Sequence, residues 1–139
     1  MYLARLPGKD SMTAHAHALL ISGDSVSRDR FARLTRSAGL HLRTVDSCEA
    51  ASIELMNSNG EFMVVILDGK LPDADALEFL AECKRAHPRW ICTVFISTDD
   101  GEQDRALAAG TEIYCTEHCT DEELASRLET ARHIAALTD

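Results

Sequence analysis

The chain has 139 residues, of which 45% are hydrophobic, and 23 acidic against 14 basic residues give it a net charge of −9. This length fits one domain with a sizeable core. The acidic balance argues against direct nucleic-acid binding, which needs a basic surface to displace counterions. No apolar run approaches the roughly 20 residues that span a bilayer, and the start of the chain lacks a signal-peptide pattern, so we expect a cytoplasmic protein without a membrane partner.

The cysteines do not form a recognisable disulfide framework. Their number is odd and their spacing is scattered, which is unlike a disulfide-rich scaffold. Most are expected to be small buried hydrophobic residues. They are Cys48, Cys83, Cys92, Cys115 and Cys119.

Residues 1–15 show no sustained periodicity and are expected to form a flexible tail, with one domain over 16–137. Within that domain apolar runs alternate with amphipathic stretches. Strands are predicted over 17–22, 41–45, 62–67, 92–97 and 112–115, and helices over 27–39, 47–60, 75–88, 100–110 and from 120 to the end.

Capping residues predict where the helices begin and end. Thr120 and Glu123 have the spacing of a capping box, in which each side chain bonds the backbone amide of the other residue. Leu124, Leu128, Ala131 and Ile134 are expected to form the buried stripe of this last helix. Further predicted caps are Ser47 for the second helix and Asp73 or Asp75 for the third, and predicted exits are Gly39, Gly60, Pro88 and Gly110.

The run "FMVVIL" at 62–67 is apolar throughout, which is typical of a strand covered on both faces in a parallel sheet. Five strands alternating with five helices favour a doubly wound α/β sheet with helices on both faces. Functional residues in such sheets lie beyond the carboxyl ends of the strands. The positions to examine are therefore 22–24, 68–70, 97–99 and 115–119.

Two segments, "MVVILDGKLPDADALEFL" and "ALAAGTEIYCTEH", resemble the receiver domain of two-component response regulators. The resemblance covers about 16–136 and implies a flavodoxin-like (βα)5 fold with strand order 2-1-3-4-5. It assigns Asp68 to the phosphoacceptor position, followed by the loop proline, Pro72. It assigns Ser97, with Thr98 as the alternative, and Tyr114 to the switch positions.

The chain departs from the pattern of that family where charge matters most. Ser22 and Gly23 occupy the positions of its metal-binding acidic pair, and Asp24 lies one residue too late. Glu117 occupies the position of its lysine, followed by His118 in place of a proline. The segment 97–110 is about two residues short, so we expect a truncated fourth helix.

These substitutions oppose phosphorylation. Two unit charges about 4 Å apart interact by roughly 4 kcal/mol at an effective dielectric near 20, so an anion in place of a cation penalises an incoming phosphoryl group. Lys70 is the remaining cation, and its ammonium can pair with Asp68 or Glu117 in place of the missing metal and lysine. The alternatives are a solvated Lys70 and an Asp68 that only caps or pairs within its loop.

The sequence thus predicts an atypical receiver module, not an enzyme, that acts by protein–protein contact with weak or no dependence on phosphorylation. The resemblance implies as partners a histidine kinase, an output domain or a second copy, bound through the fourth helix, fifth strand and fifth helix. We expect no cofactor, although weak Mg²⁺ binding is possible. One alternative is a working phosphoacceptor that recruits Mg²⁺ with Asp24 and Asp68; another is a thiol or metal sensor using Cys115, His118 and Cys119.

Overall fold

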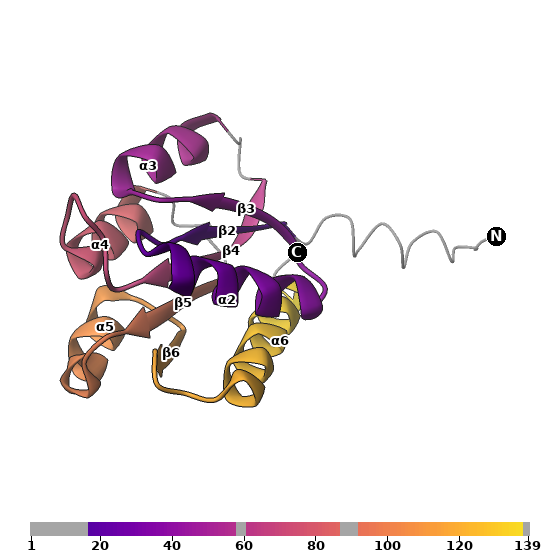
Figure 1. The fold of residues 1–139 in the computed structure, drawn as a ribbon. Coiled ribbons are helices and arrows are strands. Elements are labelled where there is room, and N and C mark those ends of the chain that lie inside the picture. Colours follow the sequence, from indigo (N-terminus) through magenta and orange to yellow (C-terminus); the bar gives the residue numbers. More distant parts are fainter. Residues whose placement is uncertain (1–16, 58–60, 87–91, 138–139) are drawn as a thin grey trace.

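Five parallel strands form one sheet at the centre of the molecule (Figure 1). The computed structural model describes residues 17–57, 61–86 and 92–137, so the predicted tail 1–15 and the predicted exits at Gly60 and Pro88 lie outside the described residues. The strands are β2 His17–Ile21, β3 His41–Val45, β4 Phe62–Asp68, β5 Cys92–Ser97 and β6 Ile113–Thr116. Their order in the sheet is β3-β2-β4-β5-β6, which confirms the predicted doubly wound order 2-1-3-4-5.

Helices cover both faces of the sheet (Figure 1). They are α2 Ser25–Ser37, α3 Cys48–Asn57, α4 Ala76–Ala86, α5 Gln103–Ala109 and α6 Asp121–Leu137, with a 3₁₀ turn at Asp100–Glu102 before α5. The buried residues of α2 and α6 pack on one face, and those of α3, α4 and α5 pack on the other. None of the helices in the described ranges is long and apolar enough to cross a membrane.

The core consists of two layers separated by the sheet. Alternate residues of β2 point to opposite layers: Ala18 and Leu20 join the α2/α6 layer, and Leu19 and Ile21 join the α3/α4/α5 layer. All four are fully buried. Burying a leucine or isoleucine side chain stabilises a fold by roughly 1.5–3 kcal/mol, so the three inner strands fix the position of the loops at their carboxyl ends.

The predicted caps are found, with one residue acting on a different helix. Thr120 and Glu123 form the predicted capping box, with both amide–side chain distances at 3.0 Å, and the Ser47 hydroxyl accepts from the amide of Ala50. Asp75 caps α4. The carboxylate of Asp73 instead accepts from the amides of Cys48 and Glu49 and so caps α3 across the loop.

Some element boundaries differ from the sequence prediction. Helix α2 begins at Ser25, two residues early, because Asp24 caps it by accepting from the amide of Ser27 at 3.0 Å. In α6 the fourth buried position is Ala135, while Ile134 is only partly buried. Helix α5 has seven residues and is capped after Ala109 by Gly110 with φ of 109°, in agreement with the expected short fourth helix.

Candidate functional site

Three polar side chains are buried where the inner strands end. Ser22 follows β2, Asp68 ends β4 and Ser97 ends β5, and each is at most 1% exposed. Backbone hydrogen bonds continue past these ends, from Gly69 N to Ile96 O at 2.8 Å and from Glu117 N to Ser97 O at 2.9 Å. Parallel strands place their carboxyl ends at one edge, so the predicted positions on the first, third, fourth and fifth strands meet here.

The carboxylate of Asp68 is held by two hydrogen bonds. Its Oδ2 accepts from the Ser22 hydroxyl at 2.8 Å, and its Oδ1 accepts from the backbone amide of Lys70 at 3.1 Å. Burial raises the pKa of Asp68 above its ordinary value, and the hydrogen bonds from Lys70 and Ser22 oppose that shift. Asp68 is therefore a desolvated acid whose two oxygens are already engaged.

The loop between β2 and α2 contributes the Ser22 hydroxyl, and its backbone at Gly23 packs closely against Pro72. Arg28 Nη1 donates to the carbonyl of Ser22 at 2.9 Å and fixes that residue. At Gly23, a Cβ atom would lie 2.7 Å from Cδ of Pro72, so a side chain at this position requires the proline to move. The Asp24 carboxylate is used to cap α2, where it also accepts from the Ser27 hydroxyl at 2.7 Å.

Lys70 and Glu117 form an ion pair across the site. Their Nζ and Oε2 atoms are 2.9 Å apart, and the two side chains are 49% and 22% exposed. The hydrogen bond and the charge of Glu117 raise the pKa of Lys70, and Asp68 and Asp24 contribute in the same direction. The sequence left open whether the Lys70 ammonium pairs with Asp68 or with Glu117. In the structure the ammonium pairs with Glu117, and the backbone amide of Lys70 donates to Asp68.

The residues that the sequence resemblance assigned to switch positions also have hydrogen-bond partners. The Ser97 hydroxyl lies 2.6 Å from Asp99 O and 2.5 Å from Oε1 of Glu102, two acceptors that share its single proton. The Tyr114 hydroxyl donates to Asp99 O at 3.1 Å. Sequence reasoning missed Glu102, because a contact across a loop and a 3₁₀ turn follows no helical or strand period.

The donor set at this edge does not fit Mg²⁺, which needs several hard oxygen ligands in octahedral geometry. Ser22 offers a hydroxyl whose proton is already given to Asp68, Gly23 offers no side chain, and Asp24 is turned to α2. Among the described residues no three His, Cys, Asp or Glu side chains converge as they would around a metal ion.

Cys115, His118 and Cys119, the alternative sensor residues, do not converge on one point. Cys115 is buried in the α2/α6 core layer and Cys119 packs against that layer. His118 is exposed, with Nε2 3.9 Å from Oε1 of Glu117. The cysteines thus belong to the core layer, and the histidine is directed to solvent.

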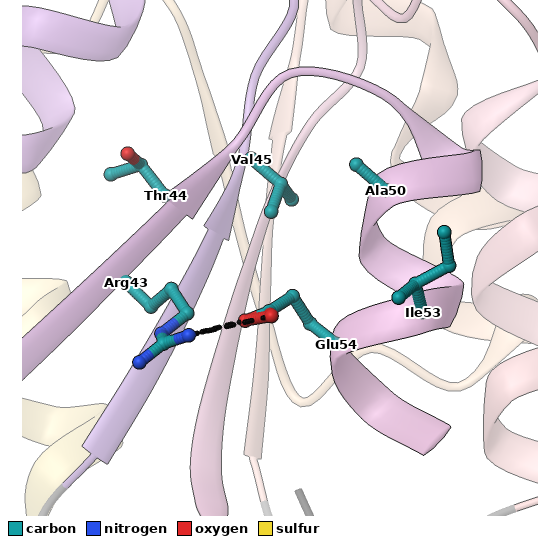
Figure 2. A pocket seen from close by; sticks show the side chains of 6 residues that line it. All are labelled: Arg43, Thr44, Val45, Ala50, Ile53 and Glu54. Atoms are coloured by element: carbon teal, nitrogen blue, oxygen red, sulfur yellow. Dashed lines mark hydrogen bonds and ion pairs between the residues drawn. The ribbon is translucent and has the colours of Figure 1, made fainter. Parts of the chain in front are cut away.

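A separate pocket of about 430 Å³ lies between β3 and α3 (Figure 2). Arg43 and Glu54 form an ion pair of 2.9 Å at its side, and Figure 2 shows the two side chains pointing toward each other. The other residues that line it are Thr44, Val45, Ala50 and Ile53. It includes none of the buried polar residues at the strand ends, and we assign it no chemistry.

Solved structures share this fold. A CheY-like response regulator receiver domain protein from Methanospirillum hungatei JF-1 superposes with a TM-score of 0.77 at 15% identity, over 89% of this chain and 98% of its own. A receiver domain protein from Clostridium thermocellum gives 0.74 at 25% identity, over 89% and 99%. The signal receiver domain of an HD domain-containing protein from Pseudomonas fluorescens Pf-5 gives 0.77 at 21% identity, over 88% and 98%.

No protein-family model matches the sequence, and neither does any curated protein. The chain has the fold of response regulator receiver domains, and its strand ends carry the Ser22–Asp68 hydrogen bond and the Lys70–Glu117 ion pair.

Proposed function

We propose that this chain is a signalling receiver module of two-component type that acts by protein–protein contact, without enzymatic activity and with weak or no dependence on phosphorylation. The observation that carries the proposal is the ion pair between Lys70 and Glu117, which places an anion and an already neutralised cation beside Asp68. The fold supports the assignment to the receiver class of signalling modules. The ion pair supports a function that depends weakly or not at all on phosphorylation.

The charges at the site oppose phosphoryl transfer to Asp68. A phosphoryl group adds close to two negative charges, which must be neutralised by cations in a partly desolvated position. Lys70 already neutralises Glu117, and the oxygens of Asp68 accept from Ser22 and from the Lys70 amide. Phosphorylation would therefore have to break the ion pair and leave Glu117 unpaired.

The switch positions support the same proposal. In the family that the chain resembles, the residues at the positions of Ser97 and Tyr114 respond to phosphate. Here Ser97 is bonded to the backbone of Asp99 and to the carboxylate of Glu102, and Tyr114 is bonded to Asp99 as well. Both side chains have partners within the protein, so neither needs a phosphoryl group to satisfy its hydroxyl.

A histidine kinase, an output domain or a second copy is the proposed type of partner, bound through α5, β6 and α6. The resemblance suggests this face. Leu107 of α5 is 48% exposed, and a single exposed leucine is common on protein surfaces, so the resemblance alone carries this choice.

Acetyl phosphate with Mg²⁺, followed by intact-mass measurement, tests the proposal. We expect no phosphoryl adduct, while a receiver domain that retains the acidic pair and the lysine becomes phosphorylated in a parallel reaction. The buried carboxylate at the end of β4 favours the phosphoacceptor alternative. A stoichiometric adduct that disappears in Asp68→Asn would establish that alternative and overturn the proposal.

A further inference from the structure

β3 lies at one edge of the sheet and pairs with its neighbour, β2, on one side only. The amide of Ser22 donates to Val45 O at 3.0 Å, so the backbone polar groups of Val45 are directed toward β2. Successive residues of a strand direct these groups to opposite sides, so those of Leu42 and Thr44 are directed away from the sheet. Within the ranges that the structure describes, no strand lies on that side to bond them.

The outer side of β3 lacks the features that commonly protect an edge strand from pairing. The strand contains neither proline nor lysine, and its register with β2 is regular from His41 to Val45. Of its five residues, His41, Arg43 and Thr44 are exposed. A regular, exposed edge with outward amides and carbonyls favours pairing with a further strand.

The helix beside this edge, α3, presents both an apolar projection and an apolar hollow. Ile53 is 53% exposed and Met56 is 77% exposed, and residues three apart on a helix lie on the same face. The pocket of about 430 Å³ between β3 and α3 has Val45, Ala50 and Ile53 as its apolar lining (Figure 2). The projecting Met56 and the hollow thus belong to one continuous face.

Charge favours a second copy of this chain as the occupant of that face. The net charge of −9 makes two copies repel each other over most of their surface. Here, however, Arg43 and Glu54 form an ion pair of 2.9 Å and supply one charge of each sign. A two-fold axis brings the same patch of two copies together, so each cation meets an anion of the other copy. A face with one cation, one anion, one projection and one hollow is complementary to itself.

We propose that β3 and α3 form the interface of a two-fold dimer, in which the β3 strands of two copies pair antiparallel and join the two five-stranded sheets. The axis passes at Arg43, and the backbone of Leu42 in each copy bonds that of Thr44 in the other. This register uses the outward backbone groups and leaves the bonds between β3 and β2 intact.

The side chains are compatible with this register. The two Arg43 side chains lie on either side of the axis and the two Glu54 carboxylates alternate with them, so the four charges balance. The exposed acid that follows β3, Asp46, lies beside His41 of the other copy and away from its own equivalent. Since α3 runs back along β3, its last turn in one copy is brought toward the first turn in the other, with Met56 directed to the pocket.

The interface is small and separate from the candidate site. A strand pair of five residues with one helix face falls at the low end of the roughly 1,200–2,000 Å² that stable interfaces bury, so the dimer should be reversible and concentration-dependent. β3 and β6 are opposite edges of the sheet, so this interface leaves α5, β6 and α6 for a partner protein. The inference does not rest on the proposed function.

Sedimentation of the full chain, from about 10 μM to about 1 mM, tests for the dimer, and hydrogen exchange locates it. We expect a monomer–dimer equilibrium in which the amides of Leu42 and Thr44 become protected as the concentration rises. The amides of Arg43 and Val45, which are directed toward β2, should be protected at every concentration.

Charge variants test whether the occupant is a second copy on this face. Arg43→Glu leaves only anions at the axis and Glu54→Arg leaves only cations, so each variant alone should be monomeric. A mixture of the two variants should form dimers again, because each then meets the opposite sign. A mixture that stays monomeric would overturn the inference.

Two further variants test the strand pairing and the apolar contact. Thr44→Pro removes an outward amide, which an edge strand tolerates, and should abolish the dimer without lowering the unfolding midpoint of the monomer by much. Met56→Glu should raise the dissociation constant at least about tenfold, since it places an unpaired charge in the contact. Leu107→Glu, the same kind of change on α5, is the matched control and should leave the constant unchanged.

Three other outcomes would overturn the inference. The first is a chain that remains monomeric at about 1 mM, a concentration at which even a weak specific dimer is populated. The second is a dimer that Leu107→Glu disrupts and Met56→Glu does not. The third is slow exchange of the Leu42 and Thr44 amides that does not depend on concentration, which would show that the edge is covered within a single chain.

Discussion

The hydroxyl of Ser22 lies 2.8 Å from Oδ2 of Asp68, and both side chains are removed from solvent. A neutral donor therefore stands beside the carboxylate, at the position that the sequence resemblance assigned to an acid. The hydrogen bond is complete within the protein. Its energetic consequences can be measured on either partner.

We expect Asp68→Asn to raise the free energy of unfolding by about 1–2 kcal/mol at pH 8, since a desolvated charge is replaced by an amide that can still bond Ser22 and the Lys70 amide. The pKa of Asp68 is raised in the native state, so its native carboxyl binds its proton more tightly than the unfolded one. Stability from that difference is complete below the ordinary pKa and is lost as pH rises through the native pKa.

The increase in the free energy of unfolding caused by Asp68→Asn should therefore grow as pH rises above about 4 and then reach a plateau. Urea unfolding between pH 4 and 8 measures it. Asp29→Asn, an exposed change on α2, serves as the control and should leave the pH dependence intact. A gain from Asp68→Asn that is the same at pH 4 and pH 8 would contradict the role of the buried charge.

Ser22→Ala should destabilise the protein by about 1–3 kcal/mol at neutral pH, because it leaves a buried carboxylate oxygen without its donor. The loss should shrink at low pH, where Asp68 is protonated and needs that donor less. The double variant Ser22→Ala/Asp68→Asn should have a higher free energy of unfolding than the sum of the two single changes predicts. Strict additivity in urea unfolding would show that the two side chains are not coupled.

Gly23→Ala should cost about 1–3 kcal/mol, since the added Cβ meets Cδ of Pro72 at 2.7 Å. Pro72→Ala removes that atom, so the double variant should recover most of the loss. Thermal unfolding of the three variants measures both effects. If the double variant is no more stable than Gly23→Ala, the close approach is not the cause.

Exchanging the charges of Lys70 and Glu117 tests their ion pair. Lys70→Glu or Glu117→Lys alone places like charges at the 2.9 Å contact and should lower the unfolding midpoint. The double exchange should restore much of the loss and of the NMR spectrum around Asp68. Lys84→Glu, which breaks the 2.6 Å pair with Glu112 elsewhere, is a control that should leave the Asp68 signals in place.

Arg30→Ala should be more destabilising than Arg33→Ala, by about 1–2 kcal/mol, because Arg30 satisfies two backbone carbonyls of the turn in addition to Asp121. Arg33 is mostly exposed, and its Nη2 lies 3.3 Å from Oδ2 of Asp121. Urea unfolding of the two variants under reducing conditions measures the difference. Equal losses would mean that the carbonyl contacts contribute nothing.

The fold was predictable because local signals and burial agree. The apolar run of β4 could be stable only in the middle of a covered sheet, and it lies there. The capping box of Thr120 and Glu123 was predictable because it is encoded within four residues. Such signals need no knowledge of distant parts of the chain.

Contacts between segments far apart in the sequence were less predictable. The sequence offered Asp73 and Asp75 as caps for one helix, whereas Asp73 caps α3, 25 residues before it. It offered Lys70 two acidic partners, and the choice of Glu117 depends on loop conformations. It also grouped Cys115, His118 and Cys119 as one candidate site, whereas the two cysteines lie at the α2/α6 core layer and His118 is exposed to solvent.

The cap that Asp73 provides makes α3 sensitive to the loop that follows β4. The amides of Cys48 and Glu49 find their acceptor only while that loop keeps its place. Any ligand or partner that displaces the loop would uncap α3 and fray its first turn, and those two amides would then exchange with solvent more rapidly. A disturbance next to Asp68, at the end of the central strand, would thereby reach the helix that follows the outer strand β3 without a change in any strand.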